Sequence, residues 1–286
     1  MRPPIIPAER REWSMSDGYL VRGRVWLPTQ PDRQHAVLYL HGIQSHGEWF
    51  EGSASLLADA GGSVVILPDR RGSGLNQEAR GDTPSWKRWL EDLDEIAAWA
   101  AREYDIRHFD LVGVSWGGKL ATAWARLHSD IVRRILLIAP GLFPAVDVGW
   151  RERFQIGRCL LTNPGRRFPI PLNDPALFTN NPLGREFIAK DALKLTDATA
   201  RFFWHSRLLD RQLLHIKAGS FQTHLTLILA EHDRIIHNTL TSMWVTRISG
   251  GGAEIESDTG SAHTLEFEAD SAVFDAMLRD WVTTIR

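Results

Sequence analysis

Short apolar runs alternate with longer amphipathic stretches through most of this 286-residue chain. Turn-forming residues bound the runs, which lie at 36–40, 64–67, 109–114, 135–138, 225–229 and 253–256. Continuous apolar runs of this length are typical of strands that are covered on both faces, and helices usually connect such strands. The alternation therefore predicts an α/β fold, with a mostly parallel central sheet and helices on both faces.

Turn and capping residues refine this outline. Residues 11–27 are expected to form an opening hairpin with Ser16-Asp17-Gly18 as its turn. Thr83 suits the N-cap of a helix and Pro84 its first position, where a missing N–H costs nothing. After them, apolar residues recur at steps of three and four. Helices are expected at 84–103, 116–128 and 266–284.

One long interval, residues 142–216, interrupts the alternation. It lacks a strand-like run but contains several helical patterns and many aromatic residues: Trp150, Phe154, Phe168, Phe178, Phe187, Phe202, Phe203 and Trp204. Open α/β sheets bind ligands at the carboxyl ends of their strands. We therefore expect residues 1–141 and 217–286 to form the core domain, and residues 142–216 to form a helical cap over that edge. The alternative is an ordinary run of core helices.

Charge and composition disfavour several classes of protein. The chain has 33 lysines and arginines against 35 aspartates and glutamates, a formal net charge of −2, and lacks the basic excess of a nucleic-acid-binding protein. Cys159 is its single cysteine, so no internal disulfide is possible. The proline-rich N-terminus does not resemble a signal peptide, and no apolar run is long enough to span a membrane. We expect a cytoplasmic protein without integral membrane association.

The strongest chemical motif is Gly113-Val114-Ser115-Trp116-Gly117, which follows an apolar run and precedes a helical pattern. A G-x-S-x-G sequence in this context is typical of a nucleophile elbow, a tight strand-to-helix turn that exposes the serine hydroxyl. The glycines keep side chains away from the crowded backbone, and the helix N-terminus favours negative charge. Ser115 is therefore the predicted nucleophile.

A serine hydroxyl needs a base that a third group holds in place. Elbow proteins of this kind carry nucleophile, acid and histidine in that chain order. Asp233 follows the strand predicted at 225–229 and is the predicted acid, with Asp258 as second choice and Glu231 as a poorer one. His263 lies in the loop before the last predicted helix and is the predicted base.

Backbone N–H groups are the predicted donors to the oxyanion of an acyl intermediate. One is that of Trp116, directly after the nucleophile, and the other that of Ile43, in the loop after the first buried run. His41 in the same loop is expected to be structural. His232 and His237 flank Asp233 without a metal-ligand pattern, so we predict neither a metal nor a cofactor.

These residues together resemble the α/β-hydrolase superfamily, within it the monoglyceride lipase and lysophospholipase-like branch related to the serine aminopeptidases. Residues 41–50 resemble that branch's H-G-x-G-E-H-x-x-x-Y loop, and residues 69–76 its D-x-x-G-x-G-x-S turn. The likeness covers most of residues 15–140 and 220–285. It departs from the pattern at Gln44, in place of a glycine, and at Asn76, in place of a serine. Bulky Trp116 after the nucleophile is a further departure.

The sequence thus predicts a serine hydrolase that cleaves a small-molecule carboxylic ester, apolar or bulky, through an acyl-enzyme. The candidate substrate-binding residues are Gln44, Phe143, Trp150, Phe203 and Trp204. A thioesterase, an aminopeptidase-like amidase and a large-lactone esterase are alternatives on the same machinery, and a non-catalytic binding protein is another. An aminopeptidase would need carboxylates to hold the substrate amine, for which Glu152, Asp174, Glu186 and Asp191 are available.

Overall fold

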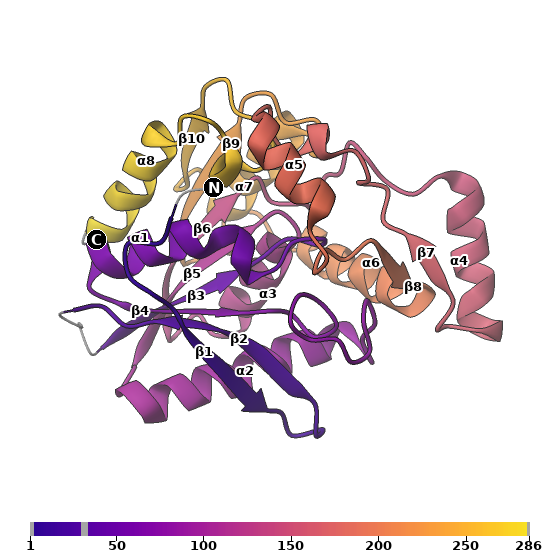
Figure 1. Cartoon of the computed structure of the whole chain (residues 1–286), viewed down its shortest axis with the longest axis horizontal. Coiled ribbons are helices and arrows are strands. Elements are labelled where there is room, and N and C mark those ends of the chain that lie inside the picture. Colours follow the sequence, from indigo (N-terminus) through magenta and orange to yellow (C-terminus); the bar gives the residue numbers. More distant parts are fainter. Residues whose placement is uncertain (1–2, 30–33, 285–286) are drawn as a thin grey trace.

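The computed structural model describes residues 3–29 and 34–284. Its centre is an eight-stranded sheet in the order β1-β2-β4-β3-β5-β6-β9-β10 (Figure 1). Strand β2 pairs antiparallel with β1 and β4, and every other pair in this sheet is parallel. The strands are β1 Glu9–Ser14, β2 Leu20–Trp26, β3 His35–Leu40, β4 Val64–Pro68, β5 His108–Val114, β6 Val132–Ile138, β9 His224–Ala230 and β10 Glu254–Asp258. The predicted fold class is confirmed.

Helices cover both faces of this sheet. Helix α1 packs against α8, and α2 packs against α3, and the two pairs lie on opposite sides of the strands in Figure 1. The bounds are α1 Glu51–Gly61, α2 Trp86–Tyr104, α3 Gly117–Leu127, α7 Asn238–Ser249 and α8 Ala272–Thr283. Within the two described ranges, no helix is both long and apolar enough to cross a membrane.

The helix boundaries differ from those expected at two places, and capping explains the first. Helix α2 begins at Trp86, because the Ser85 hydroxyl accepts the Arg88 N–H and makes Ser85 the N-cap. The Thr83 hydroxyl instead donates to the Ser85 carbonyl. Helix α8 begins only at Ala272, after a short 3-10 turn (η3) at Leu265–Phe267. Helices α1 and α7 were not predicted.

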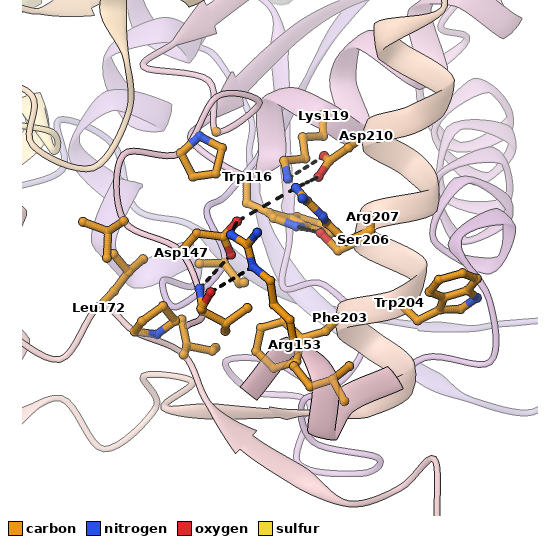
Figure 2. A pocket seen from close by; sticks show the side chains of 18 of the residues that line it. Trp116, Lys119, Asp147, Arg153, Leu172, Phe203, Trp204, Ser206, Arg207 and Asp210 are labelled. Carbon is orange, nitrogen blue, oxygen red and sulfur yellow. Dashed lines mark hydrogen bonds and ion pairs between the residues drawn. The ribbon is translucent and has the colours of Figure 1, made fainter. Parts of the chain in front are cut away.

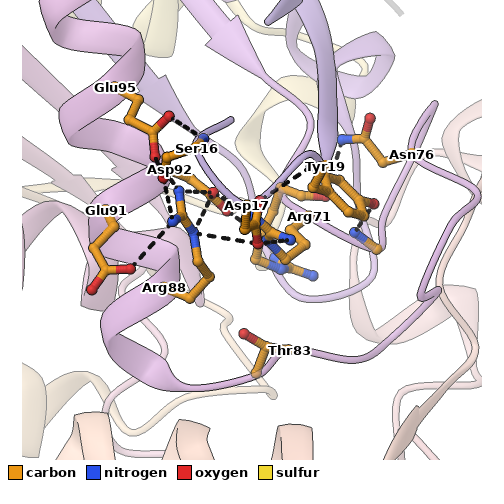
Figure 3. Close-up of polar contacts among 12 residues, drawn as sticks. Ser16, Asp17, Tyr19, Arg71, Asn76, Thr83, Arg88, Glu91, Asp92 and Glu95 are labelled. Carbon is orange, nitrogen blue, oxygen red and sulfur yellow. Dashed lines mark hydrogen bonds and ion pairs between the residues drawn. The ribbon is translucent and has the colours of Figure 1, made fainter. Parts of the chain in front are cut away.

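A partly buried ionic cluster joins the β1–β2 turn to α2 (Figure 3). Arg71, in the loop after β4, donates to both carboxylate oxygens of Asp92 on α2, at 2.9 and 2.7 Å, and lies 2.9 Å from Asp17 of the turn. Arg88 reaches Asp92 at 2.9 Å and Glu95 at 2.5 Å. This cluster therefore joins three segments that are distant in sequence.

Residues between β6 and β9 form a separate group of elements: α4 Trp150–Thr162, β7 Arg167–Pro169, η2 Pro175–Leu177, α5 Pro182–Lys190, β8 Asp197–Thr199 and α6 Ala200–Leu214. Helix α6 packs against α2, α3 and α4. In Figure 1, α4, α6, β7 and β8 lie together at one side of the sheet.

The expectation that residues 142–216 contain no strand is wrong, because β7 and β8 form a two-stranded antiparallel ladder there. Each strand has three residues, and Arg167 pairs with Thr199 across a long intervening segment. So short a strand has no periodicity to detect, and its pairing is fixed by tertiary contacts such as the Arg167–Asp197 ion pair.

Candidate active site

The segment between β5 and α3 is a sharp elbow with Ser115 at its tip. Ser115 has φ 51°, in the left-handed region that non-glycine residues rarely adopt. A Cβ on Gly113 would lie 2.7 Å from the Gly118 Cα and 2.8 Å from the Ala121 Cβ, so only glycine fits there. The Ser115 carbonyl accepts the Gly141 N–H at 2.8 Å, which fixes the turn. The side chain of Ser115 stays partly exposed while its neighbours are buried.

Three side chains from distant parts of the sequence form a hydrogen-bonded chain. The His263 Nε2 lies 2.9 Å from the Ser115 Oγ, and its Nδ1 lies 2.7 Å from the Asp233 Oδ2. Both the imidazole of His263 and the carboxylate of Asp233 are buried. The other oxygen of Asp233, Oδ1, accepts the N–H groups of Ile235 and Ile236 at 2.8 and 3.0 Å. The carboxylate is therefore fixed by its own loop and presents one oxygen to the imidazole.

The alternative acids do not contact His263. The Asp258 backbone carbonyl accepts from Glu231 and Ser261, and burial raises the pKa of the Asp258 carboxyl. Glu231 accepts the Gly260 N–H at 2.7 Å. Among the three carboxylates that the sequence offered, only Asp233 reaches the imidazole.

The loop after β3 brings Ile43 beside the elbow. The backbone N–H groups of Ile43 and Trp116 have no hydrogen-bond partner among residues 3–29 and 34–284. Both residues line the same cavity as Ser115. Two free N–H donors next to a nucleophile are the arrangement that stabilises the oxyanion of an acyl intermediate.

Arg70 holds this loop in place, and sequence analysis did not identify it. Its guanidinium donates to the carbonyls of Gly42 and Ile43, both at 3.0 Å, and stacks on the Trp116 ring at 4.5 Å. Burial lowers the pKa of Arg70 to about 9, so the side chain remains a cation at neutral pH. By fixing the carbonyl of Gly42, Arg70 also orients the next peptide N–H, that of Ile43. Arg70 lies in the turn at residues 69–76, and the resemblance of that turn to the family pattern was the sequence signal that could have pointed to it.

His41 has a structural part in the same loop. Its Nδ1 lies 2.8 Å from the Gly42 carbonyl, and its Nε2 accepts the Arg70 N–H at 2.8 Å. An imidazole that accepts at Nε2 and donates at Nδ1 is neutral. Burial, helped by the nearby Arg70 cation, holds the pKa of His41 well below its usual range.

Ser115 lines a cavity of about 350 Å³. Figure 2 shows other residues that line this cavity, among them Trp116, Leu172 and Phe203. Its walls are mostly apolar and come largely from the segment between β6 and β9, together with Ile235 and Ile236. Apolar wall residues include Val146, Val148, Ile156, Leu160, Ile170, Leu172 and Phe203. The size and the apolar lining are typical of small-molecule sites.

The structure brings only two of the five predicted substrate-binding residues to this cavity. Phe203 and Trp204 line it, with Trp204 46% exposed. Gln44 is buried outside the lining, and its backbone carbonyl accepts the Leu195 N–H. Phe143 packs against the core. Trp150 is 75% exposed on α4 and borders a separate surface depression, because α4 turns a different face, with Ile156 and Leu160, toward the cavity.

Trp116, the unusual residue after the nucleophile, lies in the wall of the cavity. Its indole stacks on Phe202 and donates to the Ser206 Oγ on α6 at 2.8 Å. The bulky side chain therefore joins the elbow to α6.

The family model described as serine aminopeptidase, S33, matches residues 31–270. The chain belongs to this family. The predicted resemblance to the α/β-hydrolases and to their serine-aminopeptidase-related branch is thereby confirmed. This match spans strands β3 to β10 and the whole segment between β6 and β9, while β1 and β2 precede it.

Comparison with relatives and solved structures supports the same fold. An uncharacterized abhydrolase domain-containing protein of Dictyostelium discoideum is 27% identical over 77% of the chain, which spans only 23% of that relative's length. The monoacylglycerol lipase of Paleococcus ferrophilus superposes with a TM-score of 0.75 at 18% identity, covering 97% of this chain and 98% of that one. A soluble variant of the Saccharomyces cerevisiae monoglyceride lipase gives 0.82 at 15% identity, covering 99% and 96%. This S33 family member therefore has the α/β-hydrolase fold.

Proposed function

We propose that this protein is a serine hydrolase that cleaves carboxylic esters, with Ser115, His263 and Asp233 as its catalytic residues. The single observation that supports this proposal most is the continuous hydrogen-bonded chain from the Ser115 Oγ through His263 to Asp233. Ser115 lines an apolar cavity together with Ile43 and Trp116, whose backbone N–H groups are free. We also propose that residues 142–216 act as a cap subdomain, since they supply most of the cavity walls.

The reaction follows from the geometry. The Ser115 Oγ attacks the ester carbonyl carbon while the His263 Nε2 takes the hydroxyl proton, and Asp233 stabilises the resulting imidazolium. The N–H groups of Ile43 and Trp116 bind the oxyanion. The tetrahedral intermediate collapses, the C–O bond of the ester breaks, and His263 gives its proton to the leaving alcohol. Water then attacks the acyl-enzyme and loses a proton to His263. When the bond between the acyl carbon and the Ser115 Oγ breaks, His263 gives this proton to the Oγ, and the acid is released.

The aminopeptidase alternative has less support from the contacts. None of the four carboxylates that sequence analysis offered for holding an amine lines the cavity. Asp191 accepts hydrogen bonds from His46 and Trp49, Glu186 pairs with Lys190, and Glu152 and Asp174 cap the starts of α4 and η2. Two other carboxylates, Asp147 and Asp210, do line the cavity, and they pair with Arg153 and Lys119. Because all six have structural partners, the contacts favour an ester substrate over a peptide with a free amine.

The experiment combines labelling with turnover. A fluorophosphonate probe should label the wild-type protein at Ser115, and para-nitrophenyl butyrate should be hydrolysed. Ser115→Ala should lose both signals and keep the wild-type circular dichroism spectrum. Ser220→Ala, which changes an exposed serine far along the chain, is the matched control and should keep both. Ester turnover by folded Ser115→Ala at the wild-type rate would refute the proposal.

A further inference from the structure

A row of five charged side chains runs along one wall of the cavity (Figure 2). Lys119 on α3 lies 2.6 Å from Asp210 on α6, and Arg207 on α6 lies 3.6 Å from Asp210. Arg207 also lies 4.0 Å from Asp147, which Arg153 on α4 approaches at 2.8 Å. The row therefore alternates in sign and has a cation at each end.

The charges in this row do not balance. Three cations, Lys119, Arg207 and Arg153, face two carboxylates, Asp210 and Asp147. Charge in an apolar cavity is unfavourable unless an opposite charge offsets it. One further negative charge, contributed by a ligand, would make the row neutral overall.

Arg207 is the member of the row with uncommitted donors. Lys119 is buried against Asp210, and Arg153 donates to both the Val148 carbonyl and Asp147, at 2.9 and 2.8 Å. The contacts of Arg207, at 3.6 and 4.0 Å, are too long for hydrogen bonds, and its side chain makes none elsewhere in the two described ranges. It is 57% exposed. A guanidinium has five N–H donors in a planar fork, which matches the two oxygens of a carboxylate.

Contacts between α6 and the elbow set the position of Arg207 relative to Ser115. Its neighbour Ser206 accepts the indole N–H of Trp116, the residue that follows Ser115. Ser115 and Arg207 line the same cavity, and apolar residues such as Ile156 and Leu172 line the rest. These apolar walls can accommodate a hydrocarbon chain. Such a chain would join a reacting carbonyl at Ser115 to an anion at Arg207.

We propose that the cavity selects esters that carry a second, free carboxylate, joined to the scissile ester by a hydrocarbon chain, and that Arg207 binds this carboxylate. The substrate class is the monoester of an aliphatic dicarboxylic acid. This inference rests on the proposed ester hydrolase. It assigns to Arg207 the selection of substrate and no part in the bond-breaking step.

The test compares two esters that differ only in charge. One is the para-nitrophenyl monoester of suberic acid, and the other is the same ester with its free acid converted to a primary amide. We expect wild-type kcat/KM to be about tenfold higher for the acid, the scale of one charge-assisted hydrogen-bonded contact. Arg207→Gln should bring the acid-to-amide ratio of kcat/KM close to one, chiefly through a higher KM for the acid. Arg207→Lys should restore part of it.

A control variant and the contrary outcomes complete the design. Arg211→Gln changes an exposed arginine on the same helix that does not line the cavity, and it should keep the wild-type preference. Equal kcat/KM for the two esters, or an equal loss on both in Arg207→Gln, would overturn the inference and leave the ester hydrolase intact. Failure to hydrolyse either ester, together with no fluorophosphonate labelling of Ser115, would refute the proposed function and the inference with it.

Discussion

Replacing Asp233 by asparagine should disable the proposed catalytic base while preserving its position. The side chain keeps its size, and its oxygen would still be needed by the N–H groups of Ile235 and Ile236, at 2.8 and 3.0 Å. Those two donors fix the amide so that its NH₂ faces the His263 Nδ1, which now lies 2.7 Å from a carboxylate oxygen. The imidazole would then accept at Nδ1 and carry its proton on Nε2. In that tautomer, Nε2 has no lone pair with which to take the proton of Ser115.

The expected magnitude is large because the wrong tautomer removes the base altogether. Loss of the orienting carboxylate in a triad lowers kcat by about 10⁴-fold, which corresponds to about 5 kcal/mol in the activation free energy. The assay is the initial rate of para-nitrophenyl butyrate hydrolysis at pH 7, with thermal unfolding to check the fold. The binding of substrate, and hence KM, should change little.

Asp258→Asn is the matched control for this variant. Asp258 is an acid of the same type near the same strand ends, but it makes no contact with His263. Its replacement should leave kcat within about twofold of wild type, because its side chain contacts neither Ser115 nor His263. Wild-type activity in Asp233→Asn, or a loss in Asp258→Asn as large as that in Asp233→Asn, would refute the assignment of the acid.

Three further predictions concern stability. Gly113→Ala should lower the free energy of unfolding in urea by about 2 kcal/mol or more, because the new Cβ would meet backbone and side-chain atoms within 2.8 Å. Gly157→Ala is the control and should be neutral or stabilising, because nothing lies within 4 Å of its Cβ. Equal effects of the two substitutions would refute the packing argument. Since the fold keeps His41 neutral and the unfolded chain protonates it, the free energy of unfolding should fall as the pH drops below about 6.5, by up to about 1.4 kcal/mol per pH unit. Urea denaturation at pH 7.5 and 5.5 should show a smaller fall in the free energy of unfolding for His41→Gln than for wild type. An identical fall in the two proteins would contradict the prediction. Lys119→Ala should cost about 3 kcal/mol in the same assay, because the buried Asp210 carboxylate loses its partner at 2.6 Å and keeps only Arg207 at 3.6 Å. A cost under about 0.5 kcal/mol would contradict the burial of that pair.

Local sequence signals located the elements that carry the candidate site. The Gly113–Gly117 motif predicted a strained turn, and Ser115 has the positive φ that such a turn requires. The chain order of nucleophile, acid and histidine led to Asp233 and His263, which the fold brings together with Ser115. These signals succeed because each depends on a short segment, or on the order in which parallel strands end at one edge.

The composition of the cavity was much harder to predict. Aromatic content suggested Trp150 as a wall residue, yet α4 turns that side chain to the solvent and its other face inward. Helical periodicity predicts that one face is buried but not against which partner. The charged row was also absent from the sequence analysis, since Lys119 and Asp210 lie on helices that are far apart in the chain.

The amino-acid sequence alone determined the alternating fold, the elbow at Ser115 and the order of the three candidate catalytic residues. These features are encoded in apolar periodicity, glycine positions and chain order, all of which act over short spans. Only the tertiary structure decided which acid reaches His263, how Arg70 holds the oxyanion loop, and which charges face the cavity. Those are contacts between segments distant in sequence, whose side-chain directions depend on how the helices pack against the sheet and against one another.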